Sequence, residues 1–401
     1  MKKNIYRLIG ALLIGIVINF LIKFVIFNSV PNSVSSEEIK NMQLLGLKTS
    51  LYSLSFRWLP KLLTILIILL SSLLTYVKTR KILLSIITLI ILSFSPWLFI
   101  LGQTLNLHLF LLTIIVLLLI SLCHKKYWIF IISFIFILFK QWLDLKLPNL
   151  QQIIDTWPLV VRLLDFKTLF FTGDSASQYL KIPKTGYFLF FDLIPLFVGI
   201  YVLLKNQNNR SLGKIISGLF IIGLCFLFIS QSSSLNIYRG IIIFYSVSLV
   251  IAVGYEYLLH NTSYLLKALI ALIFVLNVFF TYELFYYHFD KKNSFEWGYA
   301  ETNAINQLNQ KQLKCINITQ ESGKLKQYID FFNKDVNFKT NMISNSKLDD
   351  ICYAKNNCYC LLREQELGLI GLQKEDIETI FSHYEGLPIY FLIPKNETHV
   401  Y

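Results

Sequence analysis

Residues 59–101 decide the fold: they read LPKLLTILIILLSSLLTYV-KTRK-ILLSIITLIILSFSPWLFIL. Two long apolar runs stand on either side of the basic tetrapeptide KTRK at positions 78–81. A helix needs about 20 predominantly apolar residues to cross about 30 Å of hydrocarbon. The stretch therefore predicts two transmembrane helices that are joined by a short basic turn.

The composition extends this prediction to most of the chain. The 401 residues are 55% hydrophobic and 15% charged, and the mean hydropathy is +0.57. Soluble chains carry roughly a quarter charged residues. We expect a polytopic α-helical membrane protein with about nine transmembrane helices, over residues 6–27, 59–77, 82–101, 107–123, 127–143, 187–204, 214–230, 240–259 and 265–286.

The net charge of +13 comes from Lys and Arg residues that lie mainly in the connections between these segments. Lys and Arg form no basic stripe interleaved with aromatic residues, so no nucleic-acid partner is expected. They gather instead on alternate connections, for example at 78–81 and 205–214. This pattern follows the positive-inside rule and predicts a cytoplasmic N-terminus. No small-residue cleavage site follows the first apolar run, which favours an uncleaved first helix.

Nine spans that start inside would place residues 290–401 outside the membrane. That part contains short apolar runs, KCINIT, CYCLLRE and LPIYFLIP, separated by polar stretches. Such runs are typical of short strands and indicate a small α+β domain. The expected organisation is a transmembrane domain over 1–289, with an external loop at 28–58 and an interfacial loop at 144–186, followed by an extracytoplasmic soluble domain over 290–401.

Four of the six cysteines lie in this C-terminal part, at Cys315, Cys352, Cys358 and Cys360. Their spacing lacks the paired C-x2-C of a zinc ribbon. One or two disulfides in an oxidising compartment are therefore favoured over a metal site, with the connectivity left open.

The loop at 144–186 has a pattern of its own. Its apolar residues recur near helical spacing, with charged residues between them, which predicts a helix lying at the membrane interface. A packing role and a substrate role both remain open for it. The apolar positions are Ile153, Ile154, Trp157, Val160, Val161, Leu164 and Leu169.

Several short motifs follow one another in a definite order. They are Glu37-Glu38-Ile39, Arg57-Trp58-Leu59-Pro60, Ser95-Pro96-Trp97, Thr172-Gly173-Asp174 with Gly186, Asp192, Pro195 and Gly199, Asn236-Ile237-Tyr238-Arg239, and Trp297-Gly298-Tyr299. Over residues 1 to about 310, their order resembles the C-superfamily glycosyltransferases of the protein O-mannosyltransferase and aminoarabinose-transferase type (family 39). These enzymes use polyprenyl-phosphate-linked sugars.

The resemblance implies that a sugar passes from a polyprenyl-phosphate donor to a glycan, lipid or protein acceptor on the external face. Such an inverting transfer needs a carboxylate for the acceptor hydroxyl and a cation for the leaving phosphate. Glu37 is the implied catalytic carboxylate, with Glu38 beside it. Arg239 is the implied phosphate ligand, with Arg57 second, and Asp174 would shape the site or orient Arg239.

The chain also departs from this family. The segment between Glu38 and Arg57 lacks the juxtamembrane Tyr and Pro-Pro element, and Gln103 stands where the family often has an Arg. A catalytically degenerate scaffold or subunit, and a lipid or oligosaccharide transporter or polymerase, remain alternatives. No metal ligand is assigned, although a divalent cation beside the carboxylate is compatible with the chemistry. The expected location is a bacterial plasma membrane.

Overall fold

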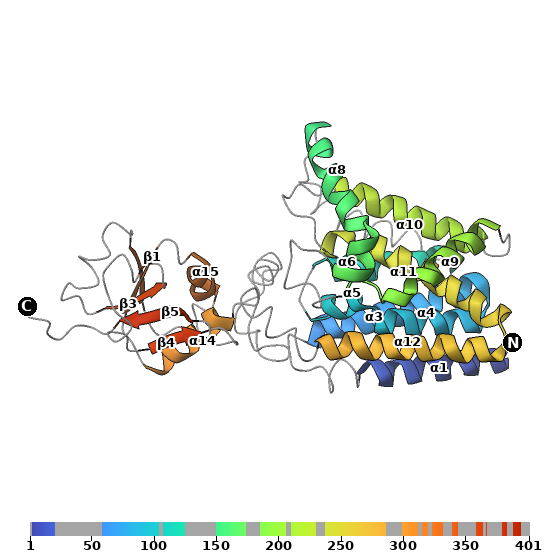
Figure 1. Cartoon of the computed structure of the whole chain (residues 1–401), viewed down its shortest axis with the longest axis horizontal. Coiled ribbons are helices and arrows are strands. Elements are labelled where there is room, and N and C mark those ends of the chain that lie inside the picture. Colours follow the sequence, from blue (N-terminus) through green and yellow to red (C-terminus); the bar gives the residue numbers. More distant parts are fainter. Residues whose placement is uncertain are drawn as a thin grey trace, which may run out of the picture. The chain divides into compact units, whose positions relative to one another are not determined.

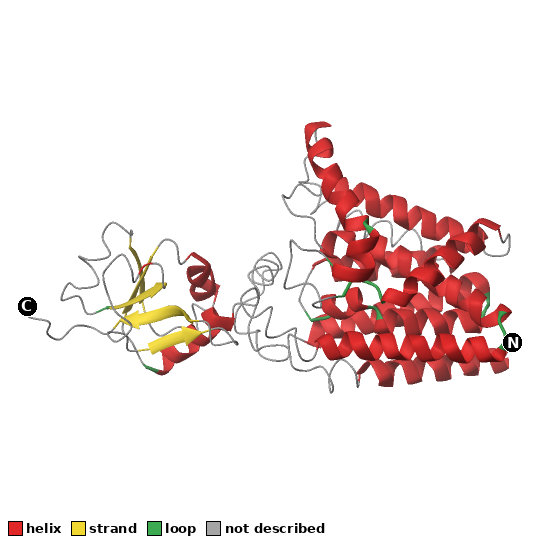
Figure 2. Cartoon of the chain, in the orientation of Figure 1, coloured by secondary structure: helices red, strands yellow, loops and turns green. Residues whose placement is uncertain are grey.

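The structure is a computed structural model. It describes residues 2–20, 58–103, 107–124, 150–173, 185–205, 210–229, 237–285, 299–311, 315–319, 323–331, 339–343, 358–363, 366, 379–382 and 388–393. These residues belong to two compact units, one built from helices and one that contains a sheet (Figure 1, Figure 2). Each unit is described by itself.

The helical unit contains most of the apolar runs. Its elements are α1 (Lys2–Phe20), α3 (Trp58–Thr79), α4 (Ile82–Phe94), α5 (Pro96–Leu101), α6 (Leu107–His124), α8 (Leu150–Leu164), the π-helical turn η4 (Thr168–Thr172), the 3-10 turn η6 (Phe190–Asp192), α9 (Leu193–Lys205), α10 (Arg210–Ile229), α11 (Ile237–Asn261) and α12 (Tyr264–Leu284).

Helices overlap each expected span that falls on described residues, and the expected span 127–143 lies outside them. Among the described residues, four helices are long and apolar enough to cross a membrane, namely Trp58–Thr79, Arg210–Phe228, Gly240–Asn261 and Tyr264–Leu284. Ile82–Phe94 and His108–Ile120 are apolar but shorter. The chain is thus mostly helical with several membrane-type helices, as its composition predicts.

The expectation of one continuous helix over 82–101 is wrong, because the helix breaks at Ser95. Ser95 has extended backbone (φ −69°, ψ 120°), and Pro96 opens the short helix α5. Proline lacks an amide hydrogen and disfavours helical backbone at the residue before it. The expected span 187–204 also begins late, since α9 starts only at Leu193.

Other parts of the helical unit pack into the helix break at Ser95. The backbone N–H of Trp97 donates to the carbonyl of Tyr187 (3.1 Å), and its indole N–H donates to Ser248 Oγ on α11 (3.1 Å). The Trp97 side chain is fully buried, and its ring lies 6.2 Å from that of Phe244. Irregular backbone at membrane depth requires such internal partners, so the Ser-Pro-Trp motif has a packing role here.

Helices α9 and α11 approach each other through glycines. A Cβ on Gly199 would collide with the carbonyl oxygen of Val250, and one on Gly254 would collide with the carbonyl oxygen of Pro195. Small residues permit this close approach between membrane helices, where packing rather than water drives association. Pro195 and Gly199 of the family-like motif are therefore explained by helix packing.

The second unit contains α14 (Tyr299–Gln310), α15 (Gly323–Phe331) and a five-stranded sheet of order β2-β1-β3-β5-β4. The strands are β1 (Cys315–Thr319), β2 (Lys339–Ile343), β3 (Tyr359–Arg363), β4 (Thr379–Ser382) and β5 (Pro388–Ile393). Strand β1 pairs in parallel with β2 and β3, whereas β5 runs antiparallel to β3 and β4. The three apolar runs that predicted strands form β1, β3 and β5.

A disulfide joins Cys315, at the start of β1, to Cys358, just before β3 (Cα–Cα 4.8 Å). Cys360 is disulfide-bonded as well, while Cys352 lies outside the described residues. The prediction of disulfides in this part of the chain is therefore confirmed.

Candidate functional site

Of the five residues predicted for the site, only one lies on described backbone. Arg239 is the third residue of α11, in its first turn. Glu37, Glu38, Arg57 and Asp174 lie outside the described residues. The convergence of these side chains on one site thus remains a prediction, and the surroundings of the first turn of α11 are what the structure adds.

The first turn of α11 lies against α8. Gly240 directly follows Arg239, and a Cβ on Gly240 would lie 3.1 Å from Leu163 Cδ2. Leu163 is itself almost fully buried. The helix that carries Arg239 therefore begins beside the helix that the sequence predicted to be interfacial.

Two ring contacts bring further helix ends to this place. Trp157 of α8 stacks on Phe228 near the end of α10, with ring centroids 5.7 Å apart. His108, at the start of α6, lies edge-on to Phe226 of α10 at 5.9 Å. The start of α6, the end of α10, the start of α11 and helix α8 are thus neighbours at one end of the helical unit, which we call the α8 end.

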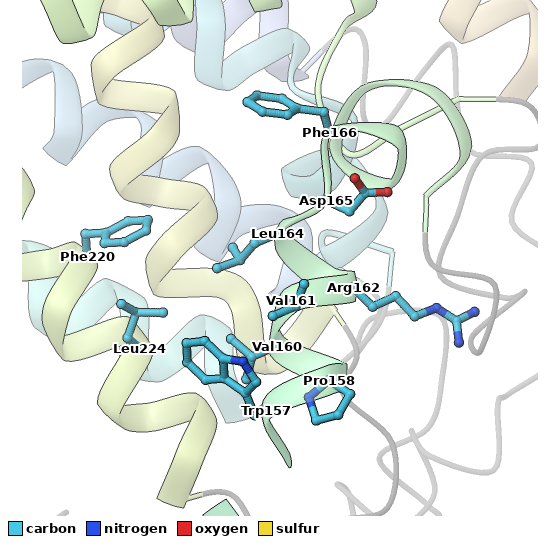
Figure 3. Close-up of a pocket in the computed structure, with 10 residues that line it drawn as sticks. All are labelled: Trp157, Pro158, Val160, Val161, Arg162, Leu164, Asp165, Phe166, Phe220 and Leu224. Atoms are coloured by element: carbon cyan, nitrogen blue, oxygen red, sulfur yellow. The ribbon is translucent and has the colours of Figure 1, made fainter. Parts of the chain in front are cut away.

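A groove of about 590 Å³ runs between α8 and α10 at this end. Figure 3 shows Trp157 and Leu164 on the side of α8 that faces Phe220 and Leu224 of α10, whereas Arg162 points away from them. The groove is mainly apolar, with charge only at its margin. It is lined by Trp157, Pro158, Val160, Val161, Arg162, Leu164, Asp165, Phe166, Phe220 and Leu224.

The groove exists because other helices cover only part of the apolar side of α8. Val160 and Leu163 are buried, but Trp157 remains 57% exposed and Ile154 55% exposed. Large apolar side chains left uncovered on an amphipathic helix are typical of contact with lipid or with an apolar ligand. The predicted amphipathic helix is confirmed, although it ends at Leu164, before the last apolar position of the pattern.

A second apolar pocket of about 400 Å³ has a lining residue that contacts a lining residue of the groove. Phe166 lines the groove, Phe170 lines the second pocket, and their rings stack with centroids 6.3 Å apart. Phe170 belongs to η4, a π-helical turn that begins just after Phe166 and ends at Gly173, whose φ is 62°. Such turns occur frequently at functional sites. The pocket is lined by Phe170, Phe171, Thr185, Phe188, Phe190, Phe191, Leu276, Asn277, Phe280 and Thr281.

Polar side chains are buried where α3 begins and α5 ends. Lys61 is 4% exposed and Gln103 is 3% exposed. Thr64 links the two helices, since its hydroxyl donates to the backbone carbonyl of Lys61 (2.7 Å) and a Cβ on Gly102, next to Gln103, would lie 3.2 Å from Thr64 Oγ1. We call Lys61, Thr64 and Gln103 the α5 polar cluster. Buried cations and amides are expensive in a membrane protein and therefore point to function.

Two further buried carboxylates hold helices together. Asp192 accepts hydrogen bonds from the hydroxyl of Tyr255 (3.0 Å) and the backbone N–H of Leu189 (3.2 Å). Glu256 forms an ion pair with Lys81 (3.0 Å). Asp192 was noticed in the sequence as part of a motif. Glu256 was missed, and its only local signal is a carboxylate within an apolar run.

The sheet unit has a polar cluster of its own, at the ends of β1 and β3. Glu366 is fully buried and accepts hydrogen bonds from the hydroxyl of Thr319 and the backbone N–H of Arg363. The hydroxyl of Tyr390 donates to Glu301 (3.2 Å), and burial raises the pKa of Tyr390 above its usual value. These contacts tie the strands and α14 together, which is a structural role.

The arrangement at the α8 end can bind an elongated apolar molecule in the groove and place a charged or polar head group near the start of α11. Within the described ranges, no group of three or more His, Cys, Asp or Glu side chains forms a candidate metal site. Comparison of the sequence with protein-family models, with curated proteins and with solved structures finds no match.

Proposed function

We propose that the chain is a membrane glycosyltransferase that moves a sugar from a polyprenyl-phosphate donor to an acceptor outside the plasma membrane. The observation that carries the proposal is the position of the first turn of α11. This turn, which contains Arg239, lies against α8 through Gly240 and Leu163, and α8 forms one wall of an apolar groove. A cation on this turn, which lies against a helix that lines an apolar groove, would suit a lipid that carries a phosphate.

The lipid tail would occupy the groove and the second pocket. Both are lined mainly by apolar side chains, and the rings of Phe166, in the groove, and Phe170, in the pocket, stack on each other. Each buried CH₂ contributes about 0.8 kcal/mol, so a chain of isoprene units gains affinity along its length. The exposed face of Trp157 would mark the level of the membrane interface, where tryptophan is enriched.

The transfer itself would proceed by direct displacement. The acceptor hydroxyl oxygen attacks the anomeric carbon, and its proton passes to Glu37 as general base. The bond between this carbon and the phosphate oxygen breaks, and polyprenyl phosphate leaves with the bonding electrons. Arg239 would stabilise the growing phosphate charge, with Arg57 and Asp174 supporting it and Glu38 beside the base. No step in this scheme runs through a metal.

The scheme requires the α8 end to face the outside of the cell, with the N-terminus in the cytoplasm and the sheet unit outside. The disulfide between Cys315 and Cys358 supports an oxidising compartment for that unit, because cytosolic thiols are kept reduced. The basic connections at 78–81 and 205–214 support the cytoplasmic assignment of the opposite end.

The experiment is Glu37→Gln in cells that lack the native chain, with the cell-envelope glycans measured by mass spectrometry. Loss of a general base reduces turnover by about 10²–10⁴-fold, so the dependent glycan should fall to the level of the deletion strain. Asp330→Asn, an exposed carboxylate on α15, is the matched control and should keep full glycosylation. Unchanged glycans in Glu37→Gln would refute the catalytic role of Glu37.

A further inference from the structure

Gln103 stands out because it combines deep burial with unused hydrogen-bonding capacity. Its side chain is 3% exposed, yet within the part of the chain that the structure describes neither the amide oxygen nor the amide nitrogen has a hydrogen-bond partner. At least nine in ten buried polar groups in proteins are paired, so a buried amide with both ends unused marks a place where another molecule completes the bonds.

The backbone fixes where this amide lies. The N–H of Gln103 donates to the carbonyl of Ile100 (3.0 Å), which holds the residue in the closing turn of α5. Gly102, one residue earlier, lies against Thr64 of α3. Gln103 is therefore held in the α5 polar cluster, and α5 and α6 both pack against α11, the helix that begins with the turn of Arg239.

The chemistry of an amide selects among the parts of a lipid-linked sugar. An amide offers two donors and an acceptor, and a hydroxyl group also both donates and accepts. A phosphate only accepts and is better matched to a cation such as Arg or Lys. An isoprenoid chain offers no hydrogen bond at all. Of the three parts, the sugar hydroxyls fit Gln103 best.

We propose that the Gln103 side chain binds a hydroxyl group of the sugar on the donor lipid and so contributes to the choice of sugar. This inference rests on the proposed glycosyltransferase function and deepens it. It concerns a residue at which the sequence departs from the Arg of the resembling family. The competing occupant is a buried water molecule that serves only the fold, and the two make opposite predictions for the same variant.

The test compares wild type, Gln103→Met and Thr113→Val in lipid nanodiscs. Thr113 is buried and its hydroxyl is satisfied by the carbonyl of Leu109 (2.8 Å), so Thr113→Val is the matched control. Each protein is titrated with bare undecaprenyl phosphate and with undecaprenyl phosphate that carries mannose or glucose. Thermal unfolding without added lipid is measured alongside.

We expect Gln103→Met to bind a sugar-bearing lipid about tenfold more weakly than wild type, as for the loss of one or two hydrogen bonds. Its affinity for bare undecaprenyl phosphate should equal that of wild type. Without lipid, its Tm should be equal to or above the wild-type Tm, because an unpaired polar group has been removed. Thr113→Val should lower the Tm and leave both affinities unchanged.

A Gln103→Met protein with a lowered Tm and wild-type affinity for the sugar-bearing lipids would identify a water-binding structural amide and overturn the inference. Equal affinities of wild type for bare and sugar-bearing lipid would overturn it as well. Failure of wild type to bind any of the lipids would instead contradict the proposed function itself, so the two failures are distinguishable.

Discussion

The hydroxyl of Tyr255 on α11 donates a hydrogen bond to Asp192 Oδ1 across 3.0 Å, and Asp192 is only 1% exposed. The contact joins α11 to the 3-10 turn that precedes α9, next to the place where Gly254 meets Pro195. It fixes the start of the short helix α9, which is preceded by a 3-10 turn and not by further α-helix. A polar pair thus specifies the position of an element that hydrophobic packing alone would leave free to slide.

Tyr255→Phe should destabilise the helical unit, because Asp192 then keeps only the backbone bond from Leu189. A buried acceptor that loses its partner costs about 1–3 kcal/mol. The measurement is thermal unfolding in detergent. Tyr264→Phe is the control, since Tyr264 is 88% exposed and its loss should leave the Tm unchanged. An unchanged Tm in Tyr255→Phe would show that the pair contributes nothing.

Gly254→Ala should lower the stability of the helical unit by more than the addition of one methyl group usually does. The added methyl would collide with the backbone carbonyl of Pro195, so a helix and not a flexible side chain must move. Overpacking of this kind costs about 1–3 kcal/mol, occasionally more. Gly218→Ala on α10 meets nothing within 4 Å and should be neutral or slightly stabilising. Equal stabilities of the two variants would contradict the close approach of α9 and α11.

Lys81→Met should destabilise the helical unit, because it removes the cation that pairs with the carboxylate of Glu256. The Lys81 side chain is 38% exposed and that of Glu256 is 10% exposed, so we expect a loss of roughly 1–3 kcal/mol, below that for a fully buried pair. Lys78→Met changes the charge of the same turn equally and serves as the control. Adding Glu256→Gln to Lys81→Met should restore most of the loss in a double-mutant cycle. An additive double variant would show that the two residues do not interact.

Cys315→Ser and Cys358→Ser should each weaken the sheet unit to the same degree. The bond closes a loop with a sequence separation of 43, which corresponds to about 4 kcal/mol in the chain-entropy account. Protease resistance of the sheet unit in the full chain measures the effect. Cys225→Ser is the control, because Cys225 is a free cysteine. If the double variant were clearly weaker than either single one, the two cysteines would have roles beyond this bond.

The sequence predicted the helices better than their interruptions. Apolar runs of sufficient length predict spans almost regardless of detail, and the described helices overlap the expected ones. The break at Ser95 was missed because a count of apolar residues over 82–101 ignores the effect of Pro96. Its stability comes from Tyr187, a residue far along the chain that no local pattern connects to it.

Long-range polar pairs could not be predicted for the same reason. Lys81 and Glu256 are 175 residues apart, and Asp192 and Tyr255 are 63 apart. In the sequence the basic turn at 78–81 indicates topology alone, whereas in the structure Lys81 also forms an ion pair with the buried Glu256. Likewise the cysteine spacing indicated disulfides, but only the fold pairs Cys315 with Cys358.

The candidate site was predicted in part. The sequence marks α8 as amphipathic and Arg239 as a residue at the mouth of a span, but it could not predict that the first turn of α11 would lie against α8. Gln103 was noticed only as a departure from the family pattern, since burial and missing hydrogen bonds are properties of the fold. The roles of Glu37, Glu38, Arg57 and Asp174 stay predictions.

The central claim is a sugar transfer supported by Arg239, which stands in the turn of α11 that lies against α8, and its most direct test is donor turnover by purified protein in liposomes. Release of polyprenyl phosphate from the sugar-bearing lipid, as the sugar passes to a hydroxyl of an added cell-envelope glycan extract, is measured for wild type, Arg239→Gln and Arg210→Gln, an exposed Arg at the start of α10. We predict that Arg239→Gln loses about 10²–10³-fold in turnover and that Arg210→Gln keeps the wild-type rate. Equal rates for all three proteins, or no turnover by wild type, would contradict the account.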